Sequence, residues 1–323
     1  TNNSWTSGSR PDGKSLFFEV GGQCLNAWQT VMAYCDSITI QGYQLSPDYE
    51  NNFSVFNETS VENIFTIPMD KNFYTNQMQY LFRSRHYNHA KAYGLSGENG
   101  SSATIEALRT FGYDTDSVDA RFDKCYFAGI MLDLNGDTIR LDNGEVLVYL
   151  PWEVDLDVSG RTSEKVAGAR MKKYAIDKTG TKDGKLSDND IVLFRYADVL
   201  LMLAECENGL GAPDKCAAYI NEVRKRAYGD KFEQHKYIAG DYADNEWAIL
   251  QERDKEFVGE GSRWFDLLRL RDSNGKPFVF SVKAHYGSSL PILTEDKAYM
   301  MLWPVNVEVL NGDPEIKQTP GYE

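Results

Sequence analysis

Three glutamates spaced four residues apart limit how this chain can fold. If they share one helix, Glu252, Glu256 and Glu260 lie on one face of it and repel one another. Such a row is stable only where cations face it, and several arginines stand close by in the sequence. We therefore predict a network of ion pairs that holds two helices together. Its members are Glu252, Arg253, Glu256, Glu260, Arg263, Asp266 and Arg269.

The residues around this row predict two helices joined by a glycine turn. Asp244 can cap the first helix, whose first turn then carries Glu246. Gly259 and Gly261 interrupt the pattern, and Ser262 can cap a second, shorter helix. We expect the charged network to clamp these two helices at the glycine turn.

An earlier pair of helices is predicted to form the core. Residues 194–208 are apolar on nearly every face, which is typical of a buried helix. Gly209 and Gly211 then stop that helix, and Pro213 suits the first turn of the next one. Two antiparallel helices across a short turn form a hairpin of the tetratricopeptide (TPR) type. The fold is therefore expected to be mostly α, with TPR-like helix pairs.

The remaining segments predict shorter elements. These are a helix within residues 23–40, a buried strand at 62–68 and a short helix at 102–111. Residues 125–155 alternate between polar and apolar, with Asn135-Gly136 and Asn143-Gly144 at the positions of hairpin turns. The C-terminal region is thus predicted to be rich in loops and to contain short β-hairpins.

Charge and hydropathy argue against two classes of function. The net charge of −14 argues against nucleic acid as a partner, because a phosphate backbone needs a basic face. No segment approaches the ~20 continuous apolar residues of a membrane-spanning helix. The chain shows no signal peptide and does not begin with Met, so we expect a mature or trimmed piece of a longer protein.

Residues 70–100 gather aromatic and hydrogen-bonding side chains without a clear period. Long irregular segments are usually functional or disordered, and this one is too aromatic for disorder. Sugar rings stack their C–H faces on aromatics and hydrogen-bond through hydroxyls, so this composition suits a glycan. The candidate ligand-binding residues are Asn72, Tyr74, Gln77, Tyr80, Arg83, Arg85, His86, Tyr87, His89 and Tyr93, with Trp5 and Trp28 as weaker candidates. The alternative is that half or more of these aromatics pack the core beneath the loop.

One stretch resembles the opening of a calcium-binding EF-hand loop. Asp133, Asn135 and Asp137 follow its spacing. However, Thr138 stands where that loop needs glycine, and Gly144 where it needs a bidentate glutamate. A hairpin turn is therefore favoured, with a structural calcium ion as the alternative.

Histidine and cysteine positions indicate no other metal site. His86 and His89 have no nearby cysteine or carboxylate to complete a set of ligands, so hydrogen bonding within the loop is favoured. The five cysteines form no CxxC pair and lie near no histidine. Cys206 and Cys216 flank the helix turn and could pair, although small buried fillers are favoured for all five. We expect no cofactor.

The glutamate row could also serve an enzyme. A glycoside hydrolase needs two carboxyl groups about 5 to 9 Å apart, and Glu252 and Glu256 are candidates for that pair. An arginine lies within four residues of each, and such a partner keeps a carboxylate ionised, which does not suit a general acid. A structural role is therefore favoured over catalysis.

A set of motifs runs through most of the chain. Near its middle stand residues 195–205 (RYADVLLMLAE) and Asn221-x-x-Arg224-x-Arg226-Ala227. Later come Glu252-Arg253-x-x-Glu256-x-x-x-Glu260-Gly261-x-Arg263-x-x-Asp266-Leu267-x-Arg269 and the ending Gln318-Thr319-Pro320-Gly321-Tyr322. Upstream stand Tyr43-x-Leu45-x-Pro47-x-Tyr49, Glu62-Asn63-Ile64-Phe65-x-Ile67-Pro68 and Asn99-Gly100-Ser101-Ser102-Ala103-Thr104. From about Trp28 to the C-terminus, their order and spacing resemble the SusD/RagB family.

This resemblance implies a mostly α fold in which TPR-like helix pairs support a loop-rich ligand face. It implies a non-catalytic, lipid-anchored protein on the outer membrane of a Gram-negative bacterium, which delivers glycan to a SusC-like TonB-dependent transporter. Family members are considerably longer, and their first helical repeats and lipid-bearing cysteine precede anything that aligns here. On this basis, residues 1–50 end the TPR-like region and residues 51–323 form the SusD/RagB C-terminal region.

Three other functions stay open. The same scaffold would capture peptides or protein-derived nutrients through a less aromatic groove. A glycoside hydrolase would use Glu252 and Glu256. A structural subunit would bind only the transporter, through loop residues such as Tyr74, Tyr80 and Tyr87.

Overall fold

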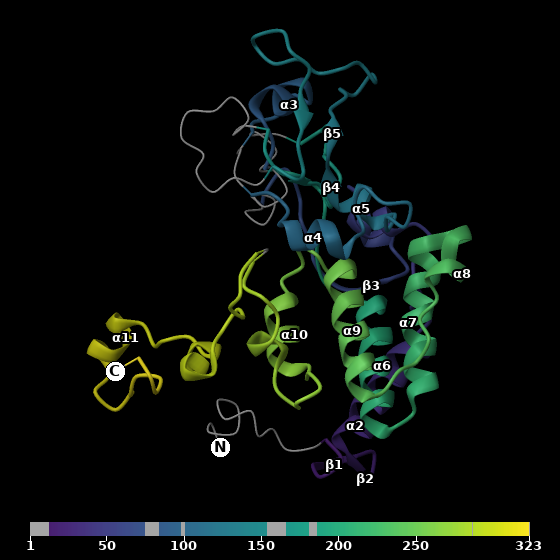
Figure 1. Ribbon diagram of the computed structural model, residues 1–323, viewed down its shortest axis with the longest axis vertical. Helices are drawn as coiled ribbons and strands as arrows, with labels where there is room; N and C mark the ends of the chain where they lie inside the picture. Colours follow the sequence, from purple (N-terminus) through teal and green to yellow (C-terminus); the bar gives the residue numbers. More distant parts are fainter. Residues whose placement is uncertain are drawn as a thin grey trace.

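Four helices form the core of the computed structural model, which describes residues 13–74, 84–97, 101–153, 166–180, 186–285 and 287–322. They are α2 (Ala27–Thr39), α6 (Tyr196–Leu210), α7 (Pro213–Tyr228) and α9 (Tyr242–Glu256). Helix α6 lies between the others, because α2, α7 and α9 all pack against it (Figure 1). The prediction of a mostly α fold is confirmed.

The local sequence explains the hairpin of α6 and α7. Leu200, Leu201 and other apolar side chains bury most of the surface of α6. Gly211 ends this helix at a φ of 85°, a left-handed conformation that glycine adopts without a steric cost. Pro213 occupies the first turn of α7, as predicted. Gly209, which was expected to stop α6, instead lies inside it.

The glutamate row does not lie on a single helix. Glu252 and Glu256 belong to α9, which ends at Glu256, and Glu260 lies in the turn that follows. Gly259 and Gly261 form this turn with φ values of 76° and 83°, and helix α10 (Arg263–Arg269) begins after it. The two-helix arrangement was predicted, but the continuous face was not observed.

The helix caps differ in detail from those predicted. The cap of α9 is Asp241, three residues before the predicted cap Asp244, because Asp241 accepts a hydrogen bond from the backbone N–H of Asp244. The carboxylate of Asp244 accepts one from Asp241 in return, which completes a capping box. Ser262 stands at the cap position of α10, but its side chain makes no capping hydrogen bond.

Short antiparallel strands pair across the described residues. The pairs are β1 (Phe17–Val20) with β2 (Gln23–Asn26), β3 (Asn63–Ile67) with β8 (Ile191–Arg195), β4 (Tyr126–Phe127) with β7 (Arg170–Met171), and β5 (Gly129–Ile130) with β6 (Val148–Tyr149). The helix expected within residues 23–40 therefore begins after β2, where Asn26 caps it. The strand expected to be buried is β3, but one of its faces is open to solvent, since Phe65 is 55% exposed.

Shorter helices and turns complete the fold. The helices are α3 (Tyr87–Ala92), α4 (Ile105–Thr110), α5 (Arg121–Cys125), α8 (Phe232–His235) and α11 (Val307–Gly312). The 3-10 turns are η1 (Tyr49–Phe53), η2 (Asn57–Thr59), η5 (Gly229–Lys231), η6 (Phe278–Phe280) and η7 (Glu295–Met301). A second apolar cluster around Phe53 and Phe122 lies beneath α4 and α5, and a third around Leu147 and Tyr149 fills the β5–β6 hairpin.

The turns expected at Asn135-Gly136 and Asn143-Gly144 are present. The backbone N–H of Gly136 donates to the carbonyl of Asp133, and Gly136 has a φ of 91°. The carboxylate of Asp133 accepts the N–H groups of Asn135 and Asp137 at 2.8 and 2.9 Å. This carboxylate therefore closes a hairpin turn by bonding its own backbone.

The cysteines form no disulfide bonds. All five cysteines are free, so Cys206 and Cys216 form no disulfide. Four of them are buried fillers as predicted, whereas Cys24 is exposed. Among the described residues, no helix is both long and apolar enough to cross a membrane.

Candidate functional site

Residues 70–100, the irregular segment, include helix α3, which lies at the end of the molecule opposite α2 (Figure 1). The structure divides its candidate residues by exposure. The candidates Tyr74 and Tyr87 expose 60% and 58% of their surface, and Asn72 is also exposed. Phe73, which was not a candidate, stands next to Tyr74 and exposes 77%. The rings of Phe73 and Tyr74 lie 6.4 Å apart. The candidates outside the described residues are Gln77, Tyr80, Arg83 and Trp5.

The charged and polar candidates Arg85, His86 and His89 are instead buried. The hydroxyl of Tyr149 on β6 accepts the backbone N–H of His86 at 2.7 Å and lies 3.0 Å from Nδ1 of His89. The guanidinium of Arg170 lies 5.5 Å from the centre of the Tyr149 ring. These side chains lie beneath the surface, where they support α3.

His89 is a neutral core residue. Nδ1 of His89 shares a hydrogen bond of 3.0 Å with the Tyr149 hydroxyl, and its Nε2 is buried without a hydrogen-bond partner among the described residues. Burial, followed by the positive charge of Arg85, lowers the pKa of His89 to about 3. The rings of Tyr93 and Phe127 meet the imidazole edge-on at 4.8 and 4.7 Å.

Further hydrogen bonds tie α3 to the neighbouring hairpin. Nδ1 of His86 accepts the backbone N–H of Asn88 and so caps the helix. The Asn88 amide donates to Asp142 at 2.9 Å, and the Tyr93 hydroxyl donates to the carbonyl of Leu132 at 3.1 Å. The inner side of α3 is therefore fixed, which holds Tyr87 on its outer side.

Trp28, the weaker candidate, is packed between two glycines. A Cβ atom at either Gly13 or Gly209 would come within 2.5 Å of the indole, so both positions need glycine while Trp28 lies there. The indole lines a pocket of about 390 Å³ near Asn208 and Asn245. Its Nε1 is buried without a hydrogen-bond partner among the described residues. This environment indicates packing rather than stacking on a ligand.

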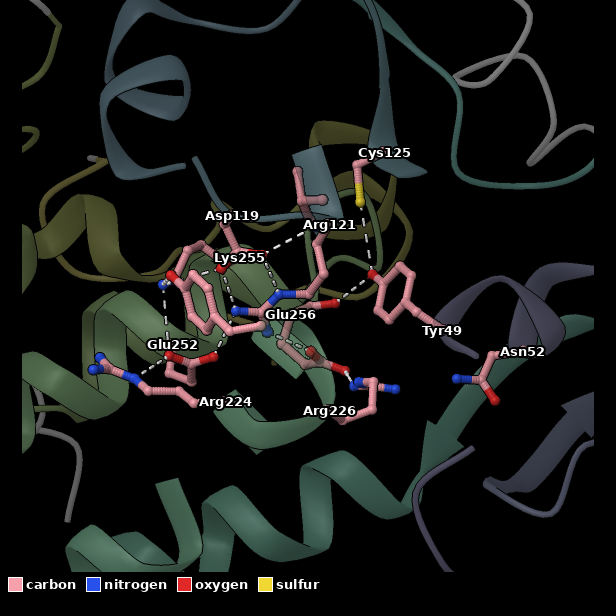
Figure 2. Close-up of polar contacts among 12 residues, drawn as sticks. Tyr49, Asn52, Asp119, Arg121, Cys125, Arg224, Arg226, Glu252, Lys255 and Glu256 are labelled. Atoms are coloured by element: carbon pink, nitrogen blue, oxygen red, sulfur yellow. Dashed lines mark hydrogen bonds and ion pairs between the residues drawn. The ribbon is translucent and has the colours of Figure 1, made fainter. Parts of the chain in front are cut away.

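A buried network of ion pairs surrounds Glu252 and Glu256 (Figure 2). Arg121 lies between the two carboxylates, 2.6 Å from Glu252 and 2.5 Å from Glu256, and it also contacts Asp119 at 2.7 Å. Arg224 reaches the other oxygen of Glu252 at 2.8 Å. Helices α5, α7 and α9 are thereby joined through charged side chains.

The other half of this network fixes β8 and the glycine turn. Arg195 donates to Glu62 at 2.7 Å, to Glu256 at 2.5 Å and to Glu260 at 2.9 Å. Arg226 contacts both Glu62 and Glu256. Lys173 lies 2.5 Å from Glu260 and donates to the backbone carbonyls of Glu256 and Val258.

The arginines nearest in sequence do not face the glutamate row, although Arg253 and Arg269 both pair with Asp266, another predicted member of the network. Arg253 contacts Asp198 at 2.6 Å and Asp266 at 2.8 Å. Arg269 contacts Asp266 and Glu205, and Arg263 lies 3.4 Å from Asp254. The cations that face the row are Arg121, Lys173, Arg195, Arg224, Arg226 and Lys255. Five of these six come from other segments, so sequence proximity to the row could not identify them, although three stand in the motifs quoted above.

This environment keeps the glutamates charged. Burial alone would raise the pKa of Glu256, but Arg226, Arg195 and Arg121 hold it well below its usual value. Burial would also raise the pKa of Glu252, but the positive charges of Lys255 and Arg121 outweigh it and the pKa is lowered. Neither side chain is exposed to solvent. Neither carboxyl can therefore serve as a general acid for an external substrate.

Nothing in the described part of the chain gathers three or more His, Cys, Asp or Glu side chains in a way that could hold a metal ion. The Nδ1 atom of each buried histidine already makes a hydrogen bond, in His89 with the Tyr149 hydroxyl and in His86 with the backbone N–H of Asn88 at the cap of α3. Sequence reasoning missed Tyr149, which organises this end of the molecule. The alternation of residues 125–155 placed it on a strand, but not beneath α3.

Comparison with known proteins gives one consistent family. The model of the SusD family matches residues 34–322. SusD-like protein P2 of Formosa agariphila is 28% identical over 243 residues, which cover 72% of this chain and 44% of that protein. A SusD superfamily protein from Bacteroides fragilis superposes with a TM-score of 0.66 at 25% identity, over 99% of this chain and 62% of its own. For surface glycan-binding protein A from Bacteroides uniformis the TM-score is 0.60 at 20% identity, over 90% of this chain and 56% of its own, a likeness of fold alone.

Proposed function

The chain belongs to the SusD family, and we propose that it is a non-catalytic protein that binds glycan at the bacterial cell surface. It spans 44% of the SusD-like relative and 62% of the Bacteroides fragilis structure compared above, so the activity of the whole protein is part of the proposal. The Bacteroides uniformis neighbour is a surface glycan-binding protein.

The observation that carries the proposal is the division of the irregular segment into exposed rings and a buried support. Tyr74 and Tyr87 expose flat apolar rings with a polar hydroxyl, which suits the C–H face and the hydroxyls of a sugar. Beneath Tyr87, hydrogen bonds of His86 and His89 with Tyr149 fix α3. A surface that is already ordered loses little entropy when it binds a ligand.

The charged network supports a structural rather than catalytic role for the carboxylates. Glu252 and Glu256 are ionised, buried and bound by cations on several sides. A glycoside hydrolase needs a carboxyl group that reaches its substrate and carries a proton. We therefore propose binding without turnover and without a cofactor.

Family membership is the basis for the remainder of the proposal. We place the protein on the outer membrane, attached by an N-terminal lipid. There it would capture glycan and deliver it to a SusC-like TonB-dependent transporter. The exposed aromatic residues would make the first contact with the ligand.

Isothermal titration calorimetry with a panel of neutral and charged oligosaccharides tests this proposal. We expect at least one glycan to bind, with a Kd between about 1 µM and 1 mM, and to be recovered intact by chromatography after prolonged incubation. A parallel titration with a mixed peptide digest serves as the comparison. Binding of peptides alone would replace the glycan proposal, and release of shorter sugars would overturn the non-catalytic one.

A further inference from the structure

A second pocket lies away from α3, between the start of α4 and the glycine turn after α9. Its walls come from residues 102–107, from Tyr126 and Met171, and from residues 253–263. These segments meet because α4 packs against α9 and β4 pairs with β7. The pocket has a volume of about 250 Å³. This is the space of roughly eight water molecules at about 30 Å³ each, enough for one small ring.

The inner wall of this pocket is apolar. Tyr126 and Phe257 line it and are themselves buried, so their rings are held by the surrounding core. Met171, Val258 and Ala107 extend this apolar wall. A ring that presents C–H groups on one face would remove this surface from water.

The rim carries a pair of opposite charges. Oδ1 of Asp254 lies 3.4 Å from Nε of Arg263, and the two side chains are 25% and 34% exposed. Nη1 of Arg263 donates to the carbonyl of Leu250 at 3.3 Å. In the part of the chain that the structure describes, Oδ2 of Asp254 and Nη2 of Arg263 have no hydrogen-bond partner. An acceptor and a donor are thus presented side by side.

Such a pair matches two adjacent hydroxyl groups. One hydroxyl can donate to the carboxylate of Asp254 while its neighbour accepts from the guanidinium of Arg263. Because the two charges balance, neither an anionic nor a cationic ligand is favoured over a neutral one. Thr104, whose Oγ1 accepts the N–H of Ala107 at 3.2 Å, still has a hydroxyl proton to donate at the same rim.

The pocket is also held in shape by the charged network. Lys173 and Arg195 hold Glu260 within the glycine turn, and Arg253 at the pocket wall is fixed by Asp198 and Asp266. A preformed pocket needs little ordering when a ligand enters.

We propose that this pocket binds one neutral pyranose unit, with its C–H face toward Phe257 and Tyr126 and two adjacent hydroxyls on Asp254 and Arg263. The inference rests on the proposed glycan-binding function and adds a second contact point to it. A glycan that meets the exposed tyrosines near α3 would then be held at a branch or an end by this pocket.

The test uses a panel of methyl glycosides of neutral hexoses and ligand-detected NMR to measure their affinities. The substitution Ala107→Phe fills the pocket from the partly exposed side of α4, and Arg263→Ala removes the donor. Lys276→Ala is the matched control, because it removes an exposed cation that pairs with Glu295 outside the pocket. Thermal unfolding of each variant establishes that it is folded.

We expect at least one glycoside to bind the wild-type protein, binding to be lost in Ala107→Phe, and affinity to fall about tenfold or more in Arg263→Ala. Lys276→Ala should bind that glycoside as the wild type does. If no glycoside binds, or if Ala107→Phe binds as well as the wild type, the pocket proposal is wrong. Oligosaccharide binding that depends on Tyr87 would still stand in that case, whereas the absence of both kinds of binding would overturn the proposed function as well.

Discussion

Nη1 of Arg195 lies 2.5 Å from Oε1 of Glu256, and both side chains are buried in the core. The pair joins β8 to the end of α9, two elements that are 61 residues apart along the chain at this contact. A buried charge that loses its partner is costly, since neither water nor another charge replaces it. We therefore assign Glu256 a structural role, in which it stabilises the packing of β8 against the end of α9.

The first prediction concerns Glu256→Gln. The substitution removes the charge that faces Arg121, Arg195 and Arg226, so we expect the free energy of unfolding to fall by about 3 to 5 kcal/mol. Urea denaturation followed by circular dichroism measures the change. As control, Glu295→Gln breaks an exposed pair with Lys276 and should change stability little. A loss below about 1 kcal/mol for Glu256→Gln would contradict a structural role for the network.

A second prediction concerns pH and His89. Burial lowers the pKa of His89 to about 3, whereas a histidine in the unfolded chain has a pKa near 6.5. As the pH falls, the unfolded chain therefore binds its proton first, and stability declines from about pH 6.5 toward pH 3. Between pH 7.5 and 5 this one group should remove about 2 kcal/mol.

The glutamates of the network act in a lower pH range. Their folded pKa values are depressed, so the stability they contribute is present above about pH 4.3 and is lost below it. Urea denaturation at pH 7.5 and 5 therefore stays above the range in which these two glutamates titrate. The variant His89→Gln should lose less stability between these two pH values than the wild type does. Equal losses would show that His89 is not a buried neutral group.

The third prediction concerns Tyr149→Phe. Removing the hydroxyl leaves the backbone N–H of His86 without its acceptor, at a cost of about 1 to 3 kcal/mol. The amides of α3 should then exchange with deuterium faster, because this contact anchors the helix. Tyr126→Phe is the matched control, since Tyr126 is also a buried tyrosine but its hydroxyl makes no hydrogen bond within the described residues. Unchanged exchange in α3 would argue against the anchoring role of Tyr149.

The sequence predicted the features that depend on near neighbours. The buried helix α6, the left-handed turn at Gly211 and the start of α7 at Pro213 follow from local pattern and backbone chemistry. The hairpin turns at Gly136 and Gly144 are equally local. Each of these features is determined within a few residues, where a single sequence is informative.

The features that depend on distant neighbours were not predictable in the same way. The need for cations around Glu256 was clear, but Arg121 and Arg195 reach it from other elements. The burial of His86 and His89 was also hidden, because an irregular segment has no period that separates an inner from an outer side. Composition therefore suggested a ligand face, but it did not separate the exposed residues that could contact a ligand from the buried residues that support them.

The exposed tyrosines are the central claim, and calorimetry of a double variant tests it most directly. We compare Tyr74→Ala/Tyr87→Ala with Tyr34→Ala, which removes an equally exposed tyrosine from α2. With about 1 kcal/mol for each stacked ring, the double variant should bind the oligosaccharide about 30-fold more weakly. Tyr34→Ala should bind it as the wild type does. Equal Kd values for the double variant and the wild type would contradict the assignment of glycan binding to these residues.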